Sequence, residues 1–409
     1  MHYRAYNKET DKDAVVRIFK EVGWYQEGMD EIGQFFLSAI RSRVAEIDGE
    51  AECLVTSAPG TIRYLEEDLR FAVIATVTTS HVARKRGLAQ RVTARVLAEE
   101  AADGALVAGL GMFEQGFYNQ LGFGTGSYTH SVKFDPAHLT VDSDFRKPTR
   151  LSSEDADALH VARLARRKGH GSCNIETVAM TRFDMGPPAK GFGLGYRDGP
   201  DGAPSHFFWC GSDYGSGPYN VAFTVFRTRE EFMELLALLK SLGDQVHTVS
   251  MREPHGMQLQ DLISQPMRDD AVRRGGRHES KIDCGAYFQF RIMDVPGCLA
   301  KTRLPGRDSL RFNLIVTDPI AERLPEDSPW RGCGGEYVVT LGPDSAAELG
   351  SDESLPTLRT TISAFTRLWL GVQPASGLAI TDCMDAPREL IDQLDWTLQL
   401  PVPHPDWDF

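Results

Sequence analysis

The residues with the clearest chemical potential are three consecutive basic side chains, Arg84, Lys85 and Arg86, directly before Gly87. A strand-like run, FAVIATVTT (71–79), leads toward this turn, and apolar residues spaced four apart predict a helix that begins just after Gly87. The free N–H groups and positive dipole end of such a helix suit a pyrophosphate. The turn is neither a P-loop nor a G-x-G-x-x-G fingerprint, and a basic turn is often plain solvated charge. Taken alone, it leaves both interpretations open.

A second candidate is the hydroxyl of Tyr118, in the run FYNQLGF (117–123). The run follows a predicted strand at 105–110 and is expected to form a short helix. Without the basic turn, Tyr118 would be interpreted as a core aromatic residue. Beside a phosphate site it becomes a candidate general acid.

The chain ends PVPHPDWDF, which combines apolar bulk with a stiff, proline-rich approach. Most termini fray and are polar, so this end is predicted to dock. The residues leave open whether the docked tail serves a function or packing alone. Asp408 is a candidate for attracting a cationic substrate, and an exposed acidic residue is its alternative.

The two motifs together resemble those of the GNAT superfamily of N-acetyltransferases. Arg84-Lys-Arg-Gly87-Leu-Ala89 matches [QR]-x-x-G-x-[GA], and the run from Phe117 to Phe123 matches F-Y-x-x-x-G-F. The whole chain is similar in length and order to the Eis type. That resemblance implies an α/β (α+β) fold with three domains: an N-terminal GNAT domain at 1–145, a GNAT-like domain without the cofactor turn at 146–284, and a domain resembling sterol carrier protein at 285–409.

The resemblance also implies roles for particular residues. Tyr118 would be the general acid and the Phe409 carboxylate the base. A free α-carboxyl is a weak base, so this group could instead bind and orient the ammonium form of the amine. The residues that would bind acetyl-CoA are Val77, Thr78, Thr79, Arg84, Lys85, Arg86, Gly87, Leu88, Ala89, Phe113 and Glu114. One departure is Gln120, where the family often has a basic residue. The family further implies a homo-oligomer, commonly a hexamer.

Chemistry sets three demands on amine acetylation. An amine with a pKa near ~10 must lose a proton before it attacks a thioester. The oxyanion needs a donor, for which the N–H of Val77 is our candidate. The departing thiolate needs a proton, which Tyr118 could supply.

The elements that must position these groups can be outlined from periodicity and caps. We predict helices beginning at a cap at Asp11 and spanning 30–45, 229–242, 354–371 and 389–398. Strands are expected at 2–6, 52–56, 69–79, 105–110, 220–228, 245–251, 288–292, 310–316 and 337–341. The polar stretch 135–149 is typical of a linker, and the glycine-rich run 191–195 of a strand or hairpin. The strand at 220–228 runs into its helix without a glycine, which argues against CoA binding there.

Composition bounds the remaining possibilities. The 409 residues carry a net charge of −13, which disfavours nucleic acid and anionic lipid and favours cationic partners. Seven scattered cysteines without a C-x-x-C pair, and no apolar run long enough for a membrane helix, indicate a cytoplasmic protein. The histidine spacing predicts no metal site.

Two classes of function remain. One is an acetyl-CoA-dependent acyltransferase acting on a polycationic amine, such as an aminoglycoside or polyamine, with a protein lysine as a variant. The other is a non-enzymatic protein that binds CoA or an apolar ligand, the latter in the C-terminal domain. Trp24, Tyr25, Phe35 and Phe36 could line a substrate cleft, but aromatic residues at helical spacing more often belong to a core. Asp30 and Glu31 could contact an amine or simply begin a helix.

Overall fold

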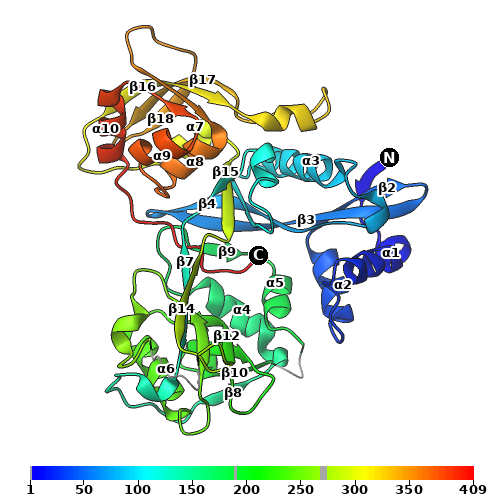
Figure 1. The fold of residues 1–409 in the computed structure, drawn as a ribbon, viewed down its shortest axis with the longest axis vertical. Coiled ribbons are helices and arrows are strands. Elements are labelled where there is room, and N and C mark those ends of the chain that lie inside the picture. Colours follow the sequence, from blue (N-terminus) through cyan, green and yellow to red (C-terminus); the bar gives the residue numbers. More distant parts are fainter. Residues whose placement is uncertain (1, 188–190, 268–273) are drawn as a thin grey trace.

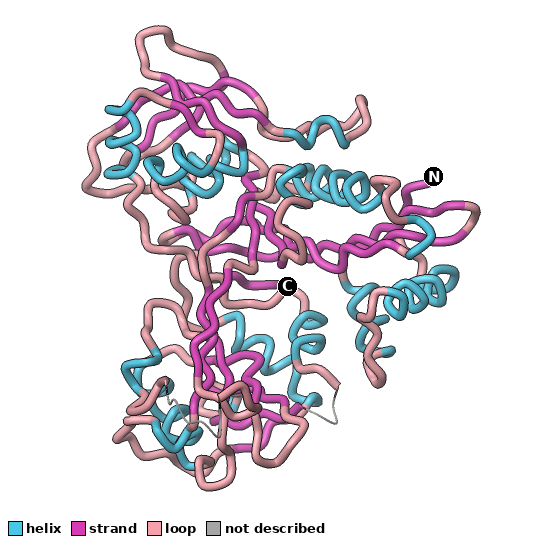
Figure 2. The backbone as a smooth tube through the Cα atoms, viewed as in Figure 1, coloured by secondary structure: helices cyan, strands magenta, loops and turns pink. Residues whose placement is uncertain are grey.

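The computed structural model describes residues 2–187, 191–267 and 274–409, and it contains three mixed β-sheets with helices packed on them (Figure 1). The three sheets form three lobes, and the first sheet lies between the other two (Figure 2). The predicted α/β class is therefore confirmed. No helix in the described ranges is long and apolar enough to cross a membrane.

The first sheet carries the basic turn. Its strand order is β1-β2-β3-β4-β5-β15-β6, and β9 pairs with β3 off this path. The strands are β1 (His2–Ala5), β2 (Arg41–Ile47), β3 (Glu50–Tyr64), β4 (Glu67–Thr79), β5 (Val107–Gly111), β6 (Gly124–Thr125), β9 (Cys173–Ile175) and β15 (Phe288–Ile292). The helices are α1 (Lys8–Glu21), α2 (Asp30–Ala39) and α3 (Leu88–Ala102), with a short 3-10 turn at Tyr118–Leu121.

Two helix predictions in this part were wrong in their bounds. The first helix begins after Asn7, whose side chain accepts the N–H of Glu9 at 2.9 Å, while Asp11 lies inside the helix and pairs with Arg4 at 2.6 Å. The second helix stops at Ala39, because the alternating residues of β2 pair with β1 on one side and β3 on the other. An apolar run of this length fits both periods, and the strand pairing decides between them.

The second sheet has the order β14-β7-β13-β12-β11-β10-β8. The strands are β7 (Thr129–Phe134), β8 (Thr149–Leu151), β10 (Gly191–Tyr196), β11 (His206–Gly211), β12 (Tyr219–Val225), β13 (Val249–Arg252) and β14 (Lys281–Gly285). The helices are α4 (Ala156–Leu164), α5 (Val178–Asp184) and α6 (Arg229–Ser241). The glycine-rich run is a strand, as predicted, and Thr228 caps α6 directly after β12.

The third sheet has the order β18-β17-β16-β19-β20. Its strands are β16 (Leu310–Thr317), β17 (Gly335–Leu341), β18 (Ala346–Leu349), β19 (Thr357–Thr361) and β20 (Met384–Asp385), and its helices are α7 (Val295–Ala300), α8 (Ile362–Trp369), α9 (Ala375–Thr381) and α10 (Arg388–Thr397). The predicted helix at 354–371 was wrong in its first half. Leu358 pairs in parallel with Leu314 of β16, and Thr361 caps α8, so threonine-rich β19 precedes a shorter helix.

Several strands from one predicted domain belong to a sheet that is formed mainly by another predicted domain. β7, from residues before 146, belongs to the second sheet, where it pairs with β13 and β14. β15, from residues after 284, belongs to the first sheet, where Phe288 pairs with Gly111. β9 joins the first sheet through Gly60 and Ile175. The sheets are therefore interlaced, and the site in the first sheet depends on segments far along the chain.

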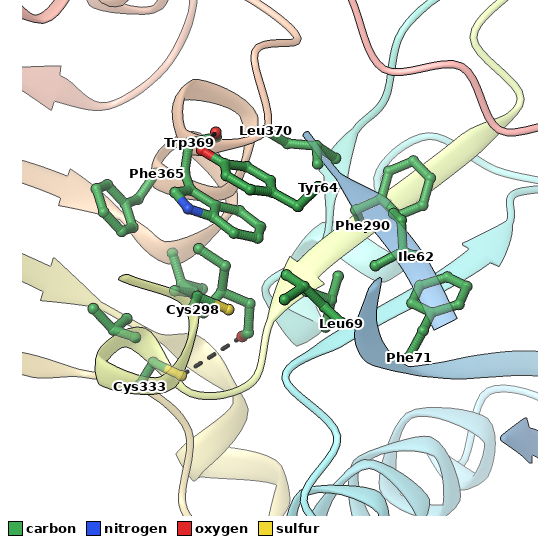
Figure 3. Packing of buried hydrophobic residues seen from close by; sticks show 14 of the residues in the cluster. Ile62, Tyr64, Leu69, Phe71, Phe290, Cys298, Cys333, Phe365, Trp369 and Leu370 are labelled. Carbon is green, nitrogen blue, oxygen red and sulfur yellow. Dashed lines mark hydrogen bonds between the residues drawn. The ribbon is translucent and has the colours of Figure 1, made fainter. Parts of the chain in front are cut away.

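The first and third sheets share one hydrophobic core (Figure 3). The rings of Tyr64 and Trp369 stack at 4.3 Å, and the Tyr64 hydroxyl donates to the Trp369 carbonyl at 3.0 Å. Nearby, the Leu65 N–H donates to Nδ1 of His170 at 3.0 Å, and Nε2 of His170 donates to the Leu370 carbonyl at 2.9 Å. Burial lowers the pKa of His170 to about 4, which keeps it neutral in this joint.

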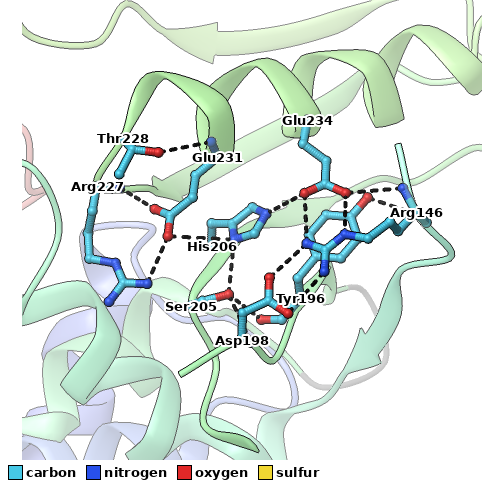
Figure 4. A network of polar contacts seen from close by, with 9 residues as sticks. All are labelled: Arg146, Tyr196, Asp198, Ser205, His206, Arg227, Thr228, Glu231 and Glu234. Atoms are coloured by element: carbon cyan, nitrogen blue, oxygen red, sulfur yellow. Dashed lines mark hydrogen bonds and ion pairs between the residues drawn. The ribbon is translucent and has the colours of Figure 1, made fainter. Parts of the chain in front are cut away.

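Ion pairs hold the stretch predicted as a linker against the second sheet (Figure 4). Arg146 lies 2.8 Å from Glu234 of α6 and 2.7 Å from Asp198, and Glu234 also contacts His206 at 3.0 Å. Hydrogen bonds from Arg146, which outweigh burial, lower the pKa of Glu234 to about 2. Residues 135–149 thus connect two strands of the second sheet, β7 and β8, and pack against that sheet.

Candidate active site

A bulge in β4 opens the first sheet. The β3–β4 register shifts between Leu54 and Thr56, and Thr76 adopts φ 50°, a left-handed conformation that is rare for a β-branched residue. The parallel pairing of β4 with β5 covers Phe71 to Ile74 and ends there. The two strands diverge beyond this point. Strained backbone of this kind concentrates at functional sites, and here it frees one edge of β4.

A cavity of about 800 Å³ lies at this divergence. Most of the predicted acetyl-CoA residues line it: Val77, Thr78, Thr79, Arg84, Lys85, Gly87, Leu88, Ala89 and Phe113. Two of them do not. Arg86 stands in the turn without lining the cavity, and the Glu114 carboxylate accepts the Gly116 N–H at 3.1 Å. The structure therefore brings together nine of the eleven predicted residues around one cavity.

The basic turn has the geometry of an anion site. Gly87 caps α3 with φ 70°, where a side chain is disfavoured, and Lys85 also has a positive φ of 61°. This conformation turns the chain sharply, so the first N–H groups of α3 border the cavity beside exposed basic side chains. The arrangement suits a polyanion such as a pyrophosphate.

Tyr118 begins the 3-10 turn and is only 2% exposed. Its ring contacts Phe113 and Phe117, which line the cavity, at centroid distances of 5.7 and 4.9 Å. Burial, with a smaller contribution from Tyr287, raises the pKa of Tyr118, so the hydroxyl keeps its proton. Tyr118 does not itself line the cavity but lies directly behind Phe113 and Phe117, which do.

The C-terminus reaches the same region. The Phe409 ring packs at 4.9 Å from Phe288 and 5.7 Å from Phe71, and an oxygen of its terminal carboxylate lies against Gly111 at the end of β5. The Tyr287 hydroxyl lies against the same glycine. Tyr287 was not predicted, because only the insertion of β15 beside β5 brings it to the site. No local sequence signal marks that pairing.

Asp408 does not stand free to meet a substrate. Its carboxylate is in an ion pair with Arg252 of β13, and the side chain is half exposed. The pair ties the tail to the second sheet and offsets the charge that made Asp408 a candidate. The predicted substrate contact therefore has a different partner in the structure.

A second pocket of about 300 Å³ adjoins the bulge. Its lining is mainly aromatic and apolar, with Asp30 as the one acidic side chain among the lining residues, and includes Phe19, Trp24, Tyr25, Phe36, Thr76 and Phe183. Trp24 lines both this pocket and the larger cavity, and Thr76 stands directly before Val77. The Tyr25 hydroxyl donates to Asp30 at 3.1 Å. The two spaces meet at the β4 bulge.

Our sequence analysis left these aromatic residues out of the site as more typical of a core. Trp24 is 47% exposed, because it stands in the loop between α1 and α2 rather than on a helix. The signal was adjacent aromatic residues near Gly23 and Gly28, outside regular helical spacing. Phe183 comes from α5, and no local pattern could have paired it with Phe36, whose ring lies 5.2 Å away.

Gln120, the departure from the motif, accepts a hydrogen bond from Gln90 of α3 at 2.8 Å. The bond joins the tyrosine turn to the helix that follows the basic turn. Within the described ranges, no group of three or more His, Cys, Asp or Glu side chains is arranged to hold a metal ion.

Comparisons with known proteins agree with this geometry. Residues 2–126 match the family model for an acetyltransferase (GNAT) domain. A search of curated protein sequences found no match. Among solved structures, a probable N-acyltransferase from Enterococcus faecalis is similar, with a TM-score of 0.80 and 16% identity, over 100% of this chain and 99% of the other. A GCN5-related N-acetyltransferase from Anabaena variabilis has a TM-score of 0.80 and 13% identity over 100% of both chains.

Eis1 from Mycobacterium abscessus matches with a TM-score of 0.74 and 16% identity, again over 100% of both chains. At these identities the likeness concerns the fold, and it extends from the first residue to the last. The bulged strand, the basic turn and the family match coincide in the first sheet. The chain thus carries a GNAT acetyltransferase domain at residues 2–126, and its whole three-lobed fold is similar to that of Eis1.

Proposed function

We propose that the protein transfers the acetyl group of acetyl-CoA to a primary amine of a polycationic acceptor, such as an aminoglycoside or a polyamine. The observation that carries this proposal is the meeting of two spaces at the β4 bulge: the 800 Å³ cavity beside the basic turn and the 300 Å³ aromatic pocket. One space suits a long phosphorylated donor, and the other suits an acceptor.

The residues present fit acetyl-CoA. The turn from Arg84 to Ala89 offers backbone N–H groups and positive charge to the pyrophosphate. From Val77 to Thr79, β4 has left its pairing with β5, so backbone groups on that edge are available to an extended pantetheine arm. Bound acetyl-CoA supplies an activated acetyl thioester. The N–H of Val77 is our candidate to stabilise the charge that develops on the carbonyl oxygen.

The chain's own groups divide the proton chemistry. A primary amine enters as an ammonium ion and must lose a proton before its nitrogen attacks. The Phe409 carboxylate can bind and orient the ammonium, and the proton passes to the carboxylate or to water. Tyr118 holds a proton for the departing sulfur, which needs one when the C–S bond breaks. Both groups belong to the same end of the first sheet, near Gly111 and Phe113.

The pocket supports a cationic acceptor in two ways. Asp30 provides a carboxylate at its wall, and aromatic faces such as those of Trp24 and Tyr25 attract cations. The net charge of −13 adds a long-range attraction for polyamines and aminoglycosides.

The test is CoA release from acetyl-CoA with a panel of polyamines, aminoglycosides and lysine peptides. We expect turnover with the small polyamines or aminoglycosides, and a large loss in a variant with one residue added after Phe409. A variant with one residue added at the N-terminus is the matched control. Turnover unaffected by the C-terminal addition would remove the carboxylate from the mechanism. Tight CoA binding without release for any amine would overturn the transferase proposal in favour of a CoA-binding protein.

A further inference from the structure

The second sheet contains an opening like the one in the first. β12 pairs in parallel with β13 only at Tyr219 and Asn220, and the strands separate from Val221 onward. The space between them is not left for a cofactor, because the chain's C-terminal segment approaches it (Figure 1). A small cavity of about 60 Å³ remains, bordered by β12, Arg252, His255 and the tail residue Asp406.

Asp406 is held there by a two-pronged ion pair. Its carboxylate oxygens accept Nη2 and Nε of Arg166 at 2.6 and 3.0 Å, and one oxygen also accepts the Cys173 N–H at 3.0 Å. The Arg166 side chain is 5% exposed, and its remaining donors bond to the Arg163 carbonyl, the Asn174 side chain and the Cys173 carbonyl, each at 2.7 Å. Every group of this buried pair is therefore satisfied.

Trp407 is fixed beside this ion pair. The ring is fully buried, with the Arg163 guanidinium 3.7 Å from its centroid, and Phe223 of β12 lies on Arg163 at 4.2 Å. Arg163 is itself paired with Asp184 of α5 at 2.6 Å. The tail tryptophan thus completes a stack built from α4 and β12, and a cation between two aromatic faces is a favourable arrangement when water is excluded.

The anchor is connected to the catalytic sheet. Cys173, whose N–H binds Asp406, begins β9, which pairs with β3 of the first sheet at Ile62. From Trp407 the chain has two residues left before the Phe409 carboxylate at Gly111. The position of the carboxylate is therefore set by a short link from a buried anchor. Packing alone would not need a buried ion pair, since apolar groups of equal volume stabilise as well.

We infer that the opening of the second sheet is a peptide-binding site for the Asp406–Trp407 pair of this chain's own C-terminus, and that Arg166 is its positioning residue. The GNAT-like second lobe serves the reaction by holding the terminal carboxylate in register with the first sheet. The role of the second lobe in the reaction rests on the proposed function, whereas the binding of the tail to the second sheet does not.

The first experiment measures release of the tail in the full chain. Carboxypeptidase is added to the folded protein, and loss of Phe409 is followed by intact mass. Arg166→Met is expected to speed this loss about tenfold or more, because it leaves the buried Asp406 carboxylate without its cationic partner and with only the Cys173 N–H as a donor. Arg167→Met is the matched control, since Arg167 borders the same cavity but bonds to the His255 carbonyl at 2.8 Å. Equal rates for both variants and wild type would overturn the inference. Asp406→Asn serves if Arg166→Met fails to fold.

The second experiment uses the tail in trans. A fluorescent peptide of residues 401–409 is titrated into a chain that ends at residue 400, and binding is followed by anisotropy. We expect saturable binding that Arg166→Met weakens about tenfold and Arg167→Met leaves unchanged. In the transferase assay, the peptide with a free carboxylate should restore turnover, and its C-terminal amide should not. This rescue should act on kcat, with KM for acetyl-CoA unchanged.

These readouts separate the two proposals. Peptide binding and tail protection without any acetyl transfer would support the anchor and count against the transferase. Acetyl transfer that is insensitive to Arg166→Met, with a tail as protected as in wild type, would overturn the anchor and leave the transferase standing. If the shortened chain does not fold, the carboxypeptidase rates decide.

Discussion

Gly111 offers the sharpest test of how the site is assembled. An alanine Cβ at this position would lie 2.5 Å from an oxygen of Phe409 and 2.5 Å from the Tyr287 hydroxyl. Ordinary contact between such atoms needs roughly 3.5 Å. Gly111→Ala must therefore displace the terminal carboxylate and the tyrosine by roughly 1 Å.

A displacement of that size is expected to lower the catalytic rate. Misplacing a reacting group by about 1 Å can cost on the order of 10² in rate. This loss corresponds to about 2.7 kcal/mol in the barrier. The overpacking itself costs typically about 1–3 kcal/mol of stability. The basic turn is not contacted by Gly111, so KM for acetyl-CoA should stay near its wild-type value while kcat falls.

The assay is steady-state CoA release with the best acceptor of the panel, with a thermal melt for each variant. Gly285→Ala is the control, because a Cβ there meets nothing within 4 Å. A kcat for Gly111→Ala within twofold of wild type would refute the reasoning, since the carboxylate and Tyr287 could then move without effect. An equal fall in Gly285→Ala would show that the loss is not local.

Three further predictions follow from single groups. Tyr118→Phe should lower kcat by about 10²–10⁴ with little change in KM, as loss of a general acid does, and an unchanged kcat would exclude that role. Gly87→Ala adds a Cβ with open space around it but forces φ 70° on alanine, at about 1–2 kcal/mol, so KM for acetyl-CoA should rise about tenfold; no change in KM would show that the turn does not hold the donor. The folded-state pKa of His170, about 4, lies below its unfolded value, so the unfolded chain binds more protons and stability falls as pH drops from 6.5 toward 4. The loss is about 3 kcal/mol, so melts between pH 4 and 7.5 should show a decrease that is larger in wild type than in His170→Gln by that amount.

The local motifs were predictable because their chemistry is contiguous. The basic turn, Gly87 and α3 follow one another directly, and the structure has this helix beginning at Leu88. Tyr118 and Phe113 are likewise carried by one short segment. A left-handed glycine before an amphipathic helix is a property of a few adjacent residues, so sequence reasoning reaches it. The catalytic roles of these residues stay predictions until the kinetics are measured.

The features that the sequence analysis missed or assigned wrongly share another cause. The predicted helices at 30–45 and 354–371 each include residues that pairing with neighbouring strands of a sheet makes into β2 and β19. Asp408 appeared free in the sequence, and Arg252 from another lobe neutralises it. The bulge at Thr76 depends on a register that β3 imposes. In each case, the competing energy comes from another element: the adjacent hairpin strand for β2 and for the bulge in β4, and a segment far along the chain for β19 and Asp408.

By itself, the sequence indicated the parts of the candidate site: a basic turn before a helix that suits phosphate, a tyrosine near it and an apolar, stiffened C-terminus. Only the tertiary structure decided where these parts meet, since β15 carries Tyr287 to β5, α5 carries Phe183 to the aromatic pocket, and Arg166 holds the tail. The physical reason is the separation along the sequence between the residues that interact. Caps, turns and periodicity are set by neighbouring residues, whereas a site built from three lobes depends on packing and paired charges between segments that no local pattern relates.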